Sequence, residues 1–428
     1  MKEFWAGPNS LALCKIFIVG ASAEDAIGAE EKMEEQVLEI PEREWPETQR
    51  SGGPKEGQAP LVRPFMPELD ALRGIAVLMV VLYHGLYWGM DLDVFPPVKR
   101  QVLTLAWTGR LGVDLFFVLS GFLITGVLMN ARARPDYYRR FYIRRALRIL
   151  PAFFLTLALL LAARAVPLNF ALLSLAYMAN LAPLLGVAIA YPVLWSLAVE
   201  EHFYLAWPWA VRKLSKRGVL ALCALIVAAS PILRLISFRI AETKGWVSYR
   251  VFDYTWNASD GLAWGAALAI YLTEFAPTRK RLAQIVGGLV LAAVAIWAAG
   301  WRYGILTRRT PVGAALQVVP WHLLFVALLL FFLLAGTSKW KRLLTPRFMT
   351  FIGEISYGLY LYHLMCFWMI EWLSVRAVAR GWIAQDWIEP FWGLWVRVLL
   401  AGVPAVLLAW LSRKYVEEPF LRLKERWT

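Results

Sequence analysis

The sequence predicts an all-α protein that crosses a membrane about ten times. Of its 428 residues, 59% are hydrophobic and 22 are tryptophan. Soluble domains contain only about 45–50% apolar residues. The apolar residues gather in runs of roughly 20, which is the length of a helix that crosses a bilayer. The three cysteines, two of them in apolar runs, indicate neither a disulfide framework nor a zinc site.

Residues 1–65 differ in composition from the rest of the chain. They hold seven basic and twelve acidic residues and include a stretch rich in Pro and Gly, which is typical of disorder. We expect either a disordered extension or a start placed too early, with Met66 as the true first residue. A signal peptide over residues 11–20 is disfavoured because that run is short and contains Lys15. Residues 66–428, the expected membrane domain, carry a net charge of +19.

Ten apolar segments have the length of a membrane span. They are roughly 72–91, 109–130, 149–166, 194–212, 218–237, 257–275, 282–300, 318–336, 350–371 and 391–412. The piece 168–190 is interrupted by Asn180 and Pro183, and we expect it not to span. With the N-terminus inside, 23 basic residues fall in short inner loops and the inner tail, as the positive-inside rule requires. Both termini are therefore expected in the cytoplasm.

The first span carries two polar residues that are costly inside a membrane. Arg73 lies at its cytoplasmic end and His84 in its outer half. Eleven residues of helix place them on one face, about 16 Å apart. Buried Arg and His side chains are functional candidates by default, although a histidine can also be satisfied by a backbone carbonyl.

Further polar residues enter the later spans. The second span carries Asp114 and Ser120, which are more often packing residues than reacting groups. Arg145 and Arg148 precede the third span as an i, i+3 pair, and such a pair suits phosphate binding by forked hydrogen bonds. They could also be positive-inside anchors.

The fourth and ninth spans carry acid–base groups. Glu200, Glu201 and His202 enter the fourth span at about the depth of His84. A carboxylate opposite an imidazole can raise its basicity, as a general base for a hydroxyl requires. Glu200 could equally pair with an arginine between helices, and His363 of the ninth span is open between packing and site. The chain thus has anion-binding residues at the inner side of the membrane and acid–base residues towards the outer side. This arrangement fits acyl-CoA as a donor: its phosphates would meet the arginines, and its long arm would carry the thioester towards His84.

These segments resemble the integral-membrane acyltransferase 3 family, which includes bacterial O-acetyltransferases of surface polysaccharides. The resemblance covers nearly all of residues 66–428 and is carried by six motifs in order: LDALRGIAVLMVVLYH, GVDLFFVLSGFLITG, FYIRRALRILP, LWSLAVEEHFYL, ISYGLYLYH and YVEEPF. It implies ten membrane helices, an acyl-CoA donor and transfer to a hydroxyl on the outer side. The implied site residues are catalytic His84 with its companion Arg73, donor-binding Arg145 and Arg148, and the motif carboxylate Glu200.

The chain departs from the family pattern at four places. His202 stands in place of a glutamine, Met365 in place of a proline and Glu418 in place of a basic residue. The arginine expected two residues before Asp260 is Ala258. None of these changes involves His84. His202, His322, Cys223 and Cys366 are interpreted as structural, and most tryptophans of the outer segments, such as Trp246, Trp256, Trp301, Trp382 and Trp387, as interfacial anchors.

We therefore expect a membrane-bound O-acyltransferase of the bacterial cytoplasmic (inner) membrane, embedded in membrane lipid. It would transfer an acyl group, most simply acetyl, from cytoplasmic acyl-CoA to a hydroxyl of an extracytoplasmic glycan or glycolipid, without metal or nucleic acid. His84 would act as a general base, assisted by a carboxylate such as Glu200, or as a transient acyl carrier. Arg73 would hold the CoA phosphates together with Arg145 and Arg148. The alternative is a transporter or flippase of a glycan or lipid intermediate, disfavoured because no internal repeat is visible. An inactive binding scaffold is disfavoured by the intact Arg73, His84 and Glu200.

Overall fold

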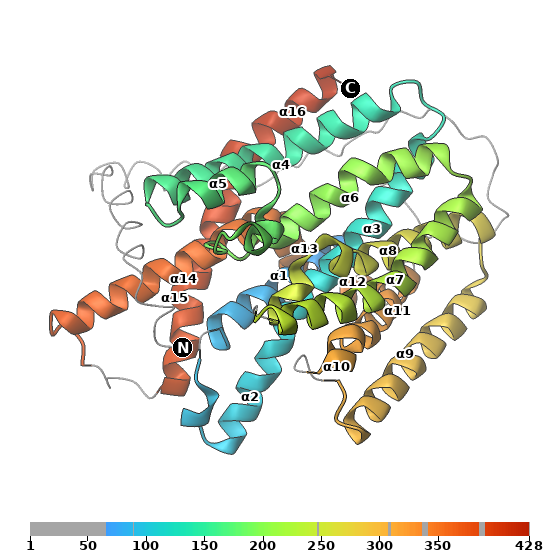
Figure 1. Ribbon diagram of the computed structural model, residues 1–428. Coiled ribbons are helices and arrows are strands. Elements are labelled where there is room, and N and C mark those ends of the chain that lie inside the picture. Colours follow the sequence, from blue (N-terminus) through green and yellow to red (C-terminus); the bar gives the residue numbers. More distant parts are fainter. Residues whose placement is uncertain are drawn as a thin grey trace.

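The computed structural model describes residues 66–88, 90–245, 248–306, 310–335, 341–384 and 390–427. These residues form an all-α fold, as predicted (Figure 1). Within this part of the chain, ten helices have 17 or more residues and lie close to the ten expected spans. They are α1 (Pro67–Leu86), α3 (Gly112–Ala131), α4 (Tyr137–Ala162), α6 (Leu194–Lys213), α7 (Lys216–Thr243), α8 (Thr255–Phe275), α9 (Arg279–Arg302), α11 (Val319–Ala335), α14 (Ser356–Ala379) and α15 (Pro390–Ser412). The predicted extension 1–65 lies outside the described residues.

Shorter elements connect the long helices or extend them. They are η4 (Leu92–Val94), α2 (Pro97–Trp107), η5 (Thr108–Leu111), α5 (Leu168–Leu175), η6 (Ala179–Leu185), η7 (Ser248–Asp253), α10 (Pro311–Leu316), α12 (Lys341–Leu344), α13 (Arg347–Glu354), the π-helical turn η8 (Arg413–Glu417) and α16 (Glu418–Trp427). The apolar piece 168–190 forms α5 and η6, of 8 and 7 residues. Neither element is long enough to cross a bilayer.

Seven helical stretches of the described chain are long and apolar enough to cross a membrane. They contain α1, α3, α4, α7, α9, α11 and α15, several of them extended by a shorter helix. The other three long helices are α6, α8 and α14, and each carries polar residues that reduce its apolar character, including Glu200, Asp260 and His363. These three helices are therefore long enough to cross a membrane, and each carries a polar side chain in its interior.

The largest difference from the expected boundaries is at α4. The apolar run predicts a span from residue 149, whereas the helix begins at Tyr137. Tyr137 and Phe141 are buried in a core cluster with α6 and α8. Their burial extends the helix through the arginine-rich segment, so that Arg145 and Arg148 occupy one continuous helix with the apolar run.

α1 lies near the middle of the bundle, where it contacts α3, α13, α14 and α15 (Figure 1). Glycines make its contact with α13 close. A Cβ atom at Gly74 would overlap the carbonyl oxygen of Met349, and a Cβ atom at Gly353 would overlap that of Asp70. This close packing fixes the beginning of α1, and with it Arg73, beside α13.

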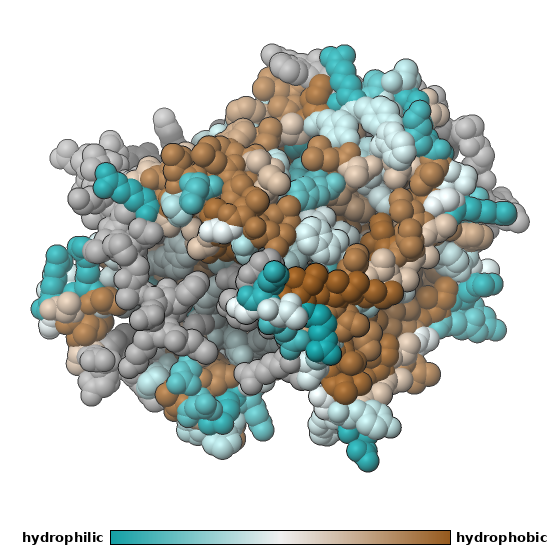
Figure 2. Space-filling view, in the orientation of Figure 1, coloured by the Kyte–Doolittle hydropathy of each residue, from teal (hydrophilic) through white to brown (hydrophobic). Residues whose placement is uncertain are grey.

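The surface carries the apolar side chains expected of a protein surrounded by lipid. Broad apolar areas cover much of the face seen in Figure 2, and hydrophilic residues lie at its margins and also near its centre. Large apolar residues on α7, α9 and α15 are exposed, including Leu225, Leu291 and Val403. Such extended exposed apolar surface is unusual for a soluble monomer and agrees with an integral membrane protein.

Candidate active site

A cavity of about 330 Å³ lies among α1, α3, α4, α6 and α14. Phenylalanine, leucine, isoleucine and valine side chains form much of its wall. Its polar lining residues come from all five helices: Arg73, Ser120, Arg145, Arg148, Ser196, Glu200, Tyr204, Ser356, Tyr357 and Tyr360. Four of the five predicted site residues, Arg73, Arg145, Arg148 and Glu200, therefore meet at one place.

Arg145 is held by groups of α6. Its Nε lies 3.4 Å from a carboxylate oxygen of Glu201, and its Nη2 lies 4.0 Å from Glu200. The guanidinium also stacks over the Tyr204 ring, with its Cζ atom 3.3 Å from the ring centroid. Two carboxylates and an aromatic face therefore compensate the charge of Arg145 inside the bundle.

Glu200 belongs to this cavity and not to the surroundings of His84. Its carboxylate accepts a hydrogen bond of 2.7 Å from the Ser120 hydroxyl, in addition to its contact with Arg145. The described part of the chain contains no contact between Glu200 and His84, which differs from the pairing expected from their depth. Depth along a helix does not determine which neighbour a side chain faces, and Glu200 faces α3 and α4.

Among the described residues, Arg148 and Arg73 differ from Arg145 in that neither contacts a carboxylate of α6. In the described chain Arg148 has neither an ion pair within 4.0 Å nor a hydrogen bond, whereas Arg73 lies 3.1 Å from the Asp70 carboxylate on its own helix. Both guanidinium-bearing side chains line the same cavity. Like charges around a common space favour the binding of an anion between them.

His84 lies in a separate, largely aromatic environment, and only 8% of it is exposed. Its Nδ1 atom lies 3.0 Å from the carbonyl oxygen of Val80 and 3.2 Å from Nε2 of His363. Trp88 stacks on the imidazole, with ring centroids 4.6 Å apart. On the neighbouring helix α15, Arg397 donates from Nη2 to the His84 carbonyl oxygen over 3.0 Å.

Tyr360 connects the cavity with the histidine pair. It lines the cavity, and its ring centroid lies 5.9 Å from that of His363 on the next turn of α14. Its hydroxyl lies 2.6 Å from the Ser196 hydroxyl of α6. Tyr360 therefore lies beside both the cavity and the histidine pair.

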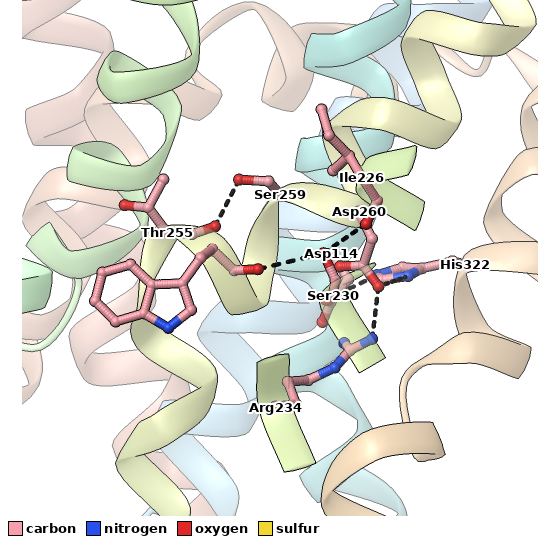
Figure 3. A network of polar contacts seen from close by, with 9 residues as sticks. Asp114, Ile226, Ser230, Arg234, Thr255, Ser259, Asp260 and His322 are labelled. Carbon is pink, nitrogen blue, oxygen red and sulfur yellow. Dashed lines mark hydrogen bonds and ion pairs between the residues drawn. The ribbon is translucent and has the colours of Figure 1, made fainter. Parts of the chain in front are cut away.

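A second group of charged side chains joins α3, α7, α8 and α11 (Figure 3). The His322 Nε2 atom lies 3.2 Å from Asp114, and its Nδ1 lies 3.3 Å from Asp260. Arg234 donates to Asp260 over 2.7 Å. Because each ring nitrogen of His322 faces a carboxylate oxygen, neither offers a free lone pair to a substrate. This ion cluster, defined as Asp114, Arg234, Asp260 and His322, joins four helices.

Arg234 and Arg397 are not among the residues singled out by the sequence analysis. Each is an arginine within an otherwise apolar span, and that signal could have identified both. Asp260 pairs with Arg234 of the neighbouring helix α7. Sequence spacing within α8 gives no information about this partner.

The described histidines, cysteines and tryptophans interpreted from the sequence as structural or as interfacial anchors lie outside the cavity and the histidine pair. His202 lies 2.6 Å from the Thr255 hydroxyl, and Cys223 and Cys366 are buried. The exposed tryptophans include Trp256, Trp301 and Trp382, whereas Trp246 and Trp387 lie outside the described residues.

Comparison with known proteins gives one family. The model of a family described as an acyltransferase domain matches residues 66–414. Curated relatives include a peptidoglycan O-acetyltransferase, OatA, of Listeria monocytogenes, which is 28% identical over 391 residues (83% of this chain and 56% of the relative). A putative peptidoglycan O-acetyltransferase, YrhL, of Bacillus subtilis is 27% identical over 389 residues (83% and 55%). The O-acetyltransferase OatA of Staphylococcus aureus is 24% identical over 390 residues (83% and 57%).

The chain thus spans little more than half the length of these curated relatives. No solved structure matches the chain.

Proposed function

Because the chain belongs to the acyltransferase 3 family, we propose that it is a membrane O-acetyltransferase that modifies a hydroxyl of a peptidoglycan-type glycan. Relatives along most of this chain are named peptidoglycan O-acetyltransferases, which supports this class of acceptor. The proposed donor is cytoplasmic acetyl-CoA.

In the proposed orientation ten helices span the bacterial cytoplasmic membrane. The Arg73 end of α1 faces the cytoplasm and the His84 end faces outward. The density of basic residues in the loops on the Arg73 side supports this orientation. The donor then enters from the inner side, and the acceptor hydroxyl approaches His84 from the outer side.

The observation that carries the proposal is the cavity that Arg73 and Arg148 both line, where Arg73 has one carboxylate partner and Arg148, among the described residues, has neither an ion pair nor a hydrogen bond. Phosphate groups of the donor would bind these two guanidinium groups by charge-assisted hydrogen bonds. Arg145 would contribute less directly, because Glu200 and Glu201 already hold it. The pantetheine arm would then extend past Tyr360 over the roughly 16 Å that separate Arg73 from His84 along α1.

We propose that His84 acts as the general base. Its imidazole accepts the proton of the acceptor hydroxyl while the oxygen attacks the thioester carbonyl carbon. The tetrahedral intermediate collapses with cleavage of the carbon–sulfur bond, and the leaving CoA sulfur takes the proton from the imidazolium. In the alternative route His84 first carries the acetyl group itself and releases CoA before the hydroxyl attacks.

Transfer of radiolabel from acetyl-CoA to a glycan acceptor in isolated membranes tests the proposal. His84→Ala is expected to abolish transfer without changing the amount of inserted protein. His202→Gln is the matched histidine control, because His202 contacts Thr255 and lies outside the cavity and the histidine pair. Full transfer by a normally inserted His84→Ala protein would refute the proposed role.

A further inference from the structure

We propose that His363 positions His84 for catalysis by accepting a hydrogen bond from its Nδ1–H, which leaves Nε2 of His84 as the reacting nitrogen. This inference rests on the proposed function of His84 as the base. It assigns to His363 of α14 a role beyond packing.

The two imidazoles face each other across the contact between α1 and α14. Their ring centroids are 4.9 Å apart, and the ring planes are inclined by 52°. The His363 Nε2 atom lies 3.2 Å from Nδ1 of His84. His363 is fully buried, so no water competes for this contact at its surface.

Each histidine also faces a carbonyl oxygen one turn earlier on its own helix. The Nδ1 of His84 lies 3.0 Å from the oxygen of Val80, and the Nδ1 of His363 lies 3.1 Å from that of Leu359. A carbonyl oxygen can only accept a hydrogen bond, so the nitrogen that faces it carries the proton. Both rings therefore have Nδ1–H in their neutral forms.

The contact between the rings follows from this assignment. Neutral His363 has no proton on Nε2, and the lone pair of that atom points at His84 Nδ1. The Nδ1–H of His84 is thus shared between two acceptors, Val80 and His363. This arrangement restrains the ring and keeps Nε2 of His84 unprotonated, as a general base requires.

The contact between His84 Nδ1 and His363 Nε2 also stabilises His84 when its imidazole is protonated. When His84 takes the acceptor proton on Nε2, its Nδ1–H becomes a stronger donor to His363, and hydrogen bonds of this charge-assisted kind are roughly twice as strong as neutral ones. His363 remains neutral, because a second buried imidazolium 3.2 Å away would be repelled. The positive charge formed during the reaction is therefore stabilised without movement of either ring.

Two substitutions of His363 distinguish a role in positioning His84 from a role in packing alone. His363→Phe fills the space but cannot accept a hydrogen bond, whereas His363→Gln places an amide oxygen near the former Nε2 atom. We expect His363→Phe to lower kcat about a hundredfold, with KM for acetyl-CoA changed less than about twofold. His363→Gln should recover activity to within about tenfold of the original protein. Equal activity of the two variants, or full activity of His363→Phe, would refute the inference.

Nitrogen NMR of the histidine side chains gives a readout independent of activity. The chain has four histidines, so His84→Gln and His363→Gln variants suffice to assign the two resonance pairs. We expect both imidazoles at neutral pH to be protonated on Nδ1 and bare on Nε2. A proton on Nε2 of His84 would contradict the inference. If His84→Ala were fully active, the proposed function itself would fail; if His84→Ala were inactive and His363→Phe fully active, only the role of His363 would.

Discussion

Arg145 and Arg148 are three residues apart on α4, yet their surroundings differ. Arg145 contacts two carboxylates and a tyrosine ring, whereas in the described chain Arg148 has no ion pair and no hydrogen bond. A buried cation that is already paired gains less from a phosphate than one that is not. In the proposed function, the R-x-x-R motif therefore divides into Arg145, which contacts α6, and Arg148, which would bind the donor.

This division predicts different effects of the two substitutions. Arg148→Gln should raise KM for acetyl-CoA about tenfold or more, the equivalent of one charge-assisted hydrogen bond, with little change of the melting temperature in detergent. Arg145→Gln should lower the melting temperature, because it leaves Glu200 and Glu201 buried without their cation. Kinetics and thermal unfolding of both purified variants provide the measurement.

The matched control is Arg139→Gln, which removes an exposed arginine from the same helix. It should change neither quantity. A normal KM in the Arg148→Gln protein would show that the donor phosphates bind elsewhere.

At the scale of elements, α3 and α8 are packed at backbone distance. A Cβ atom at Gly121 would overlap the carbonyl oxygen of Leu262, and a Cβ atom at Gly265 would overlap that of Val118. Small residues at helix crossings permit this approach in membranes. Because α3 also carries Ser120, the crossing helps to place the hydroxyl that holds Glu200.

Gly121→Ala should therefore separate α3 from α8. We expect a clear loss of thermal stability and of transfer activity, because the added methyl group meets backbone atoms that cannot rotate away. Gly126→Ala on the same helix is the control: a Cβ atom there has no neighbour within 4 Å, and alanine favours helix. Equal melting temperatures of the two variants would contradict the close crossing.

The ion cluster joins α3, α7, α8 and α11 in the same region (Figure 3). Arg234 and Asp260 are almost completely buried, with side-chain exposures of 1% and 2%. Removal of one partner from a buried pair typically costs about 3–5 kcal/mol, because the other charge remains without compensation.

Arg234→Met should thus destabilise the protein by about that amount. Arg239→Gln, on the same helix, removes an exposed pair with Glu242 and should cost less than about 1 kcal/mol. Denaturation in mixed micelles compares the two variants. If the losses in unfolding free energy of the two variants differed by less than about 1 kcal/mol, the buried charge of Asp260 would not need Arg234 for its compensation.

The helices could be predicted from sequence more completely than the contacts between them. Runs of about 20 apolar residues gave the ten long helices, and the short elements of 168–190 agreed with the interruptions at Asn180 and Pro183. Motif residues identified the arginines of the cavity. Pairings across helices could not be derived, because periodicity along one helix does not determine which helix lies opposite. The contacts of Glu200 with Ser120, of Asp260 with Arg234 and of His84 with His363 are of this kind.

At the scale of the whole molecule, α1 contributes to both sites: Arg73, near its beginning, lines the cavity, and His84, near its end, belongs to the histidine pair. Tyr360 of α14 contacts both, since it lines the cavity and lies near His363. This arrangement suits a reaction whose two substrates come from opposite sides of the membrane. A donor held at the arginines would deliver only its thioester end to His84. The proposed function therefore requires one orientation, with the Arg73 end of α1 in the cytoplasm.

Labelling of introduced cysteines tests this orientation. Val98 of α2 and Lys280 of α9 are exposed and lie, respectively, in the expected outer and inner connections. In a chain with its three cysteines replaced by alanine, a membrane-impermeant maleimide should label Val98→Cys in intact cells and Lys280→Cys only after permeabilisation. Both positions should react in permeabilised cells, which controls for their accessibility. The reverse pattern would place the arginines of the cavity on the outer side and exclude cytoplasmic acetyl-CoA as a donor bound there.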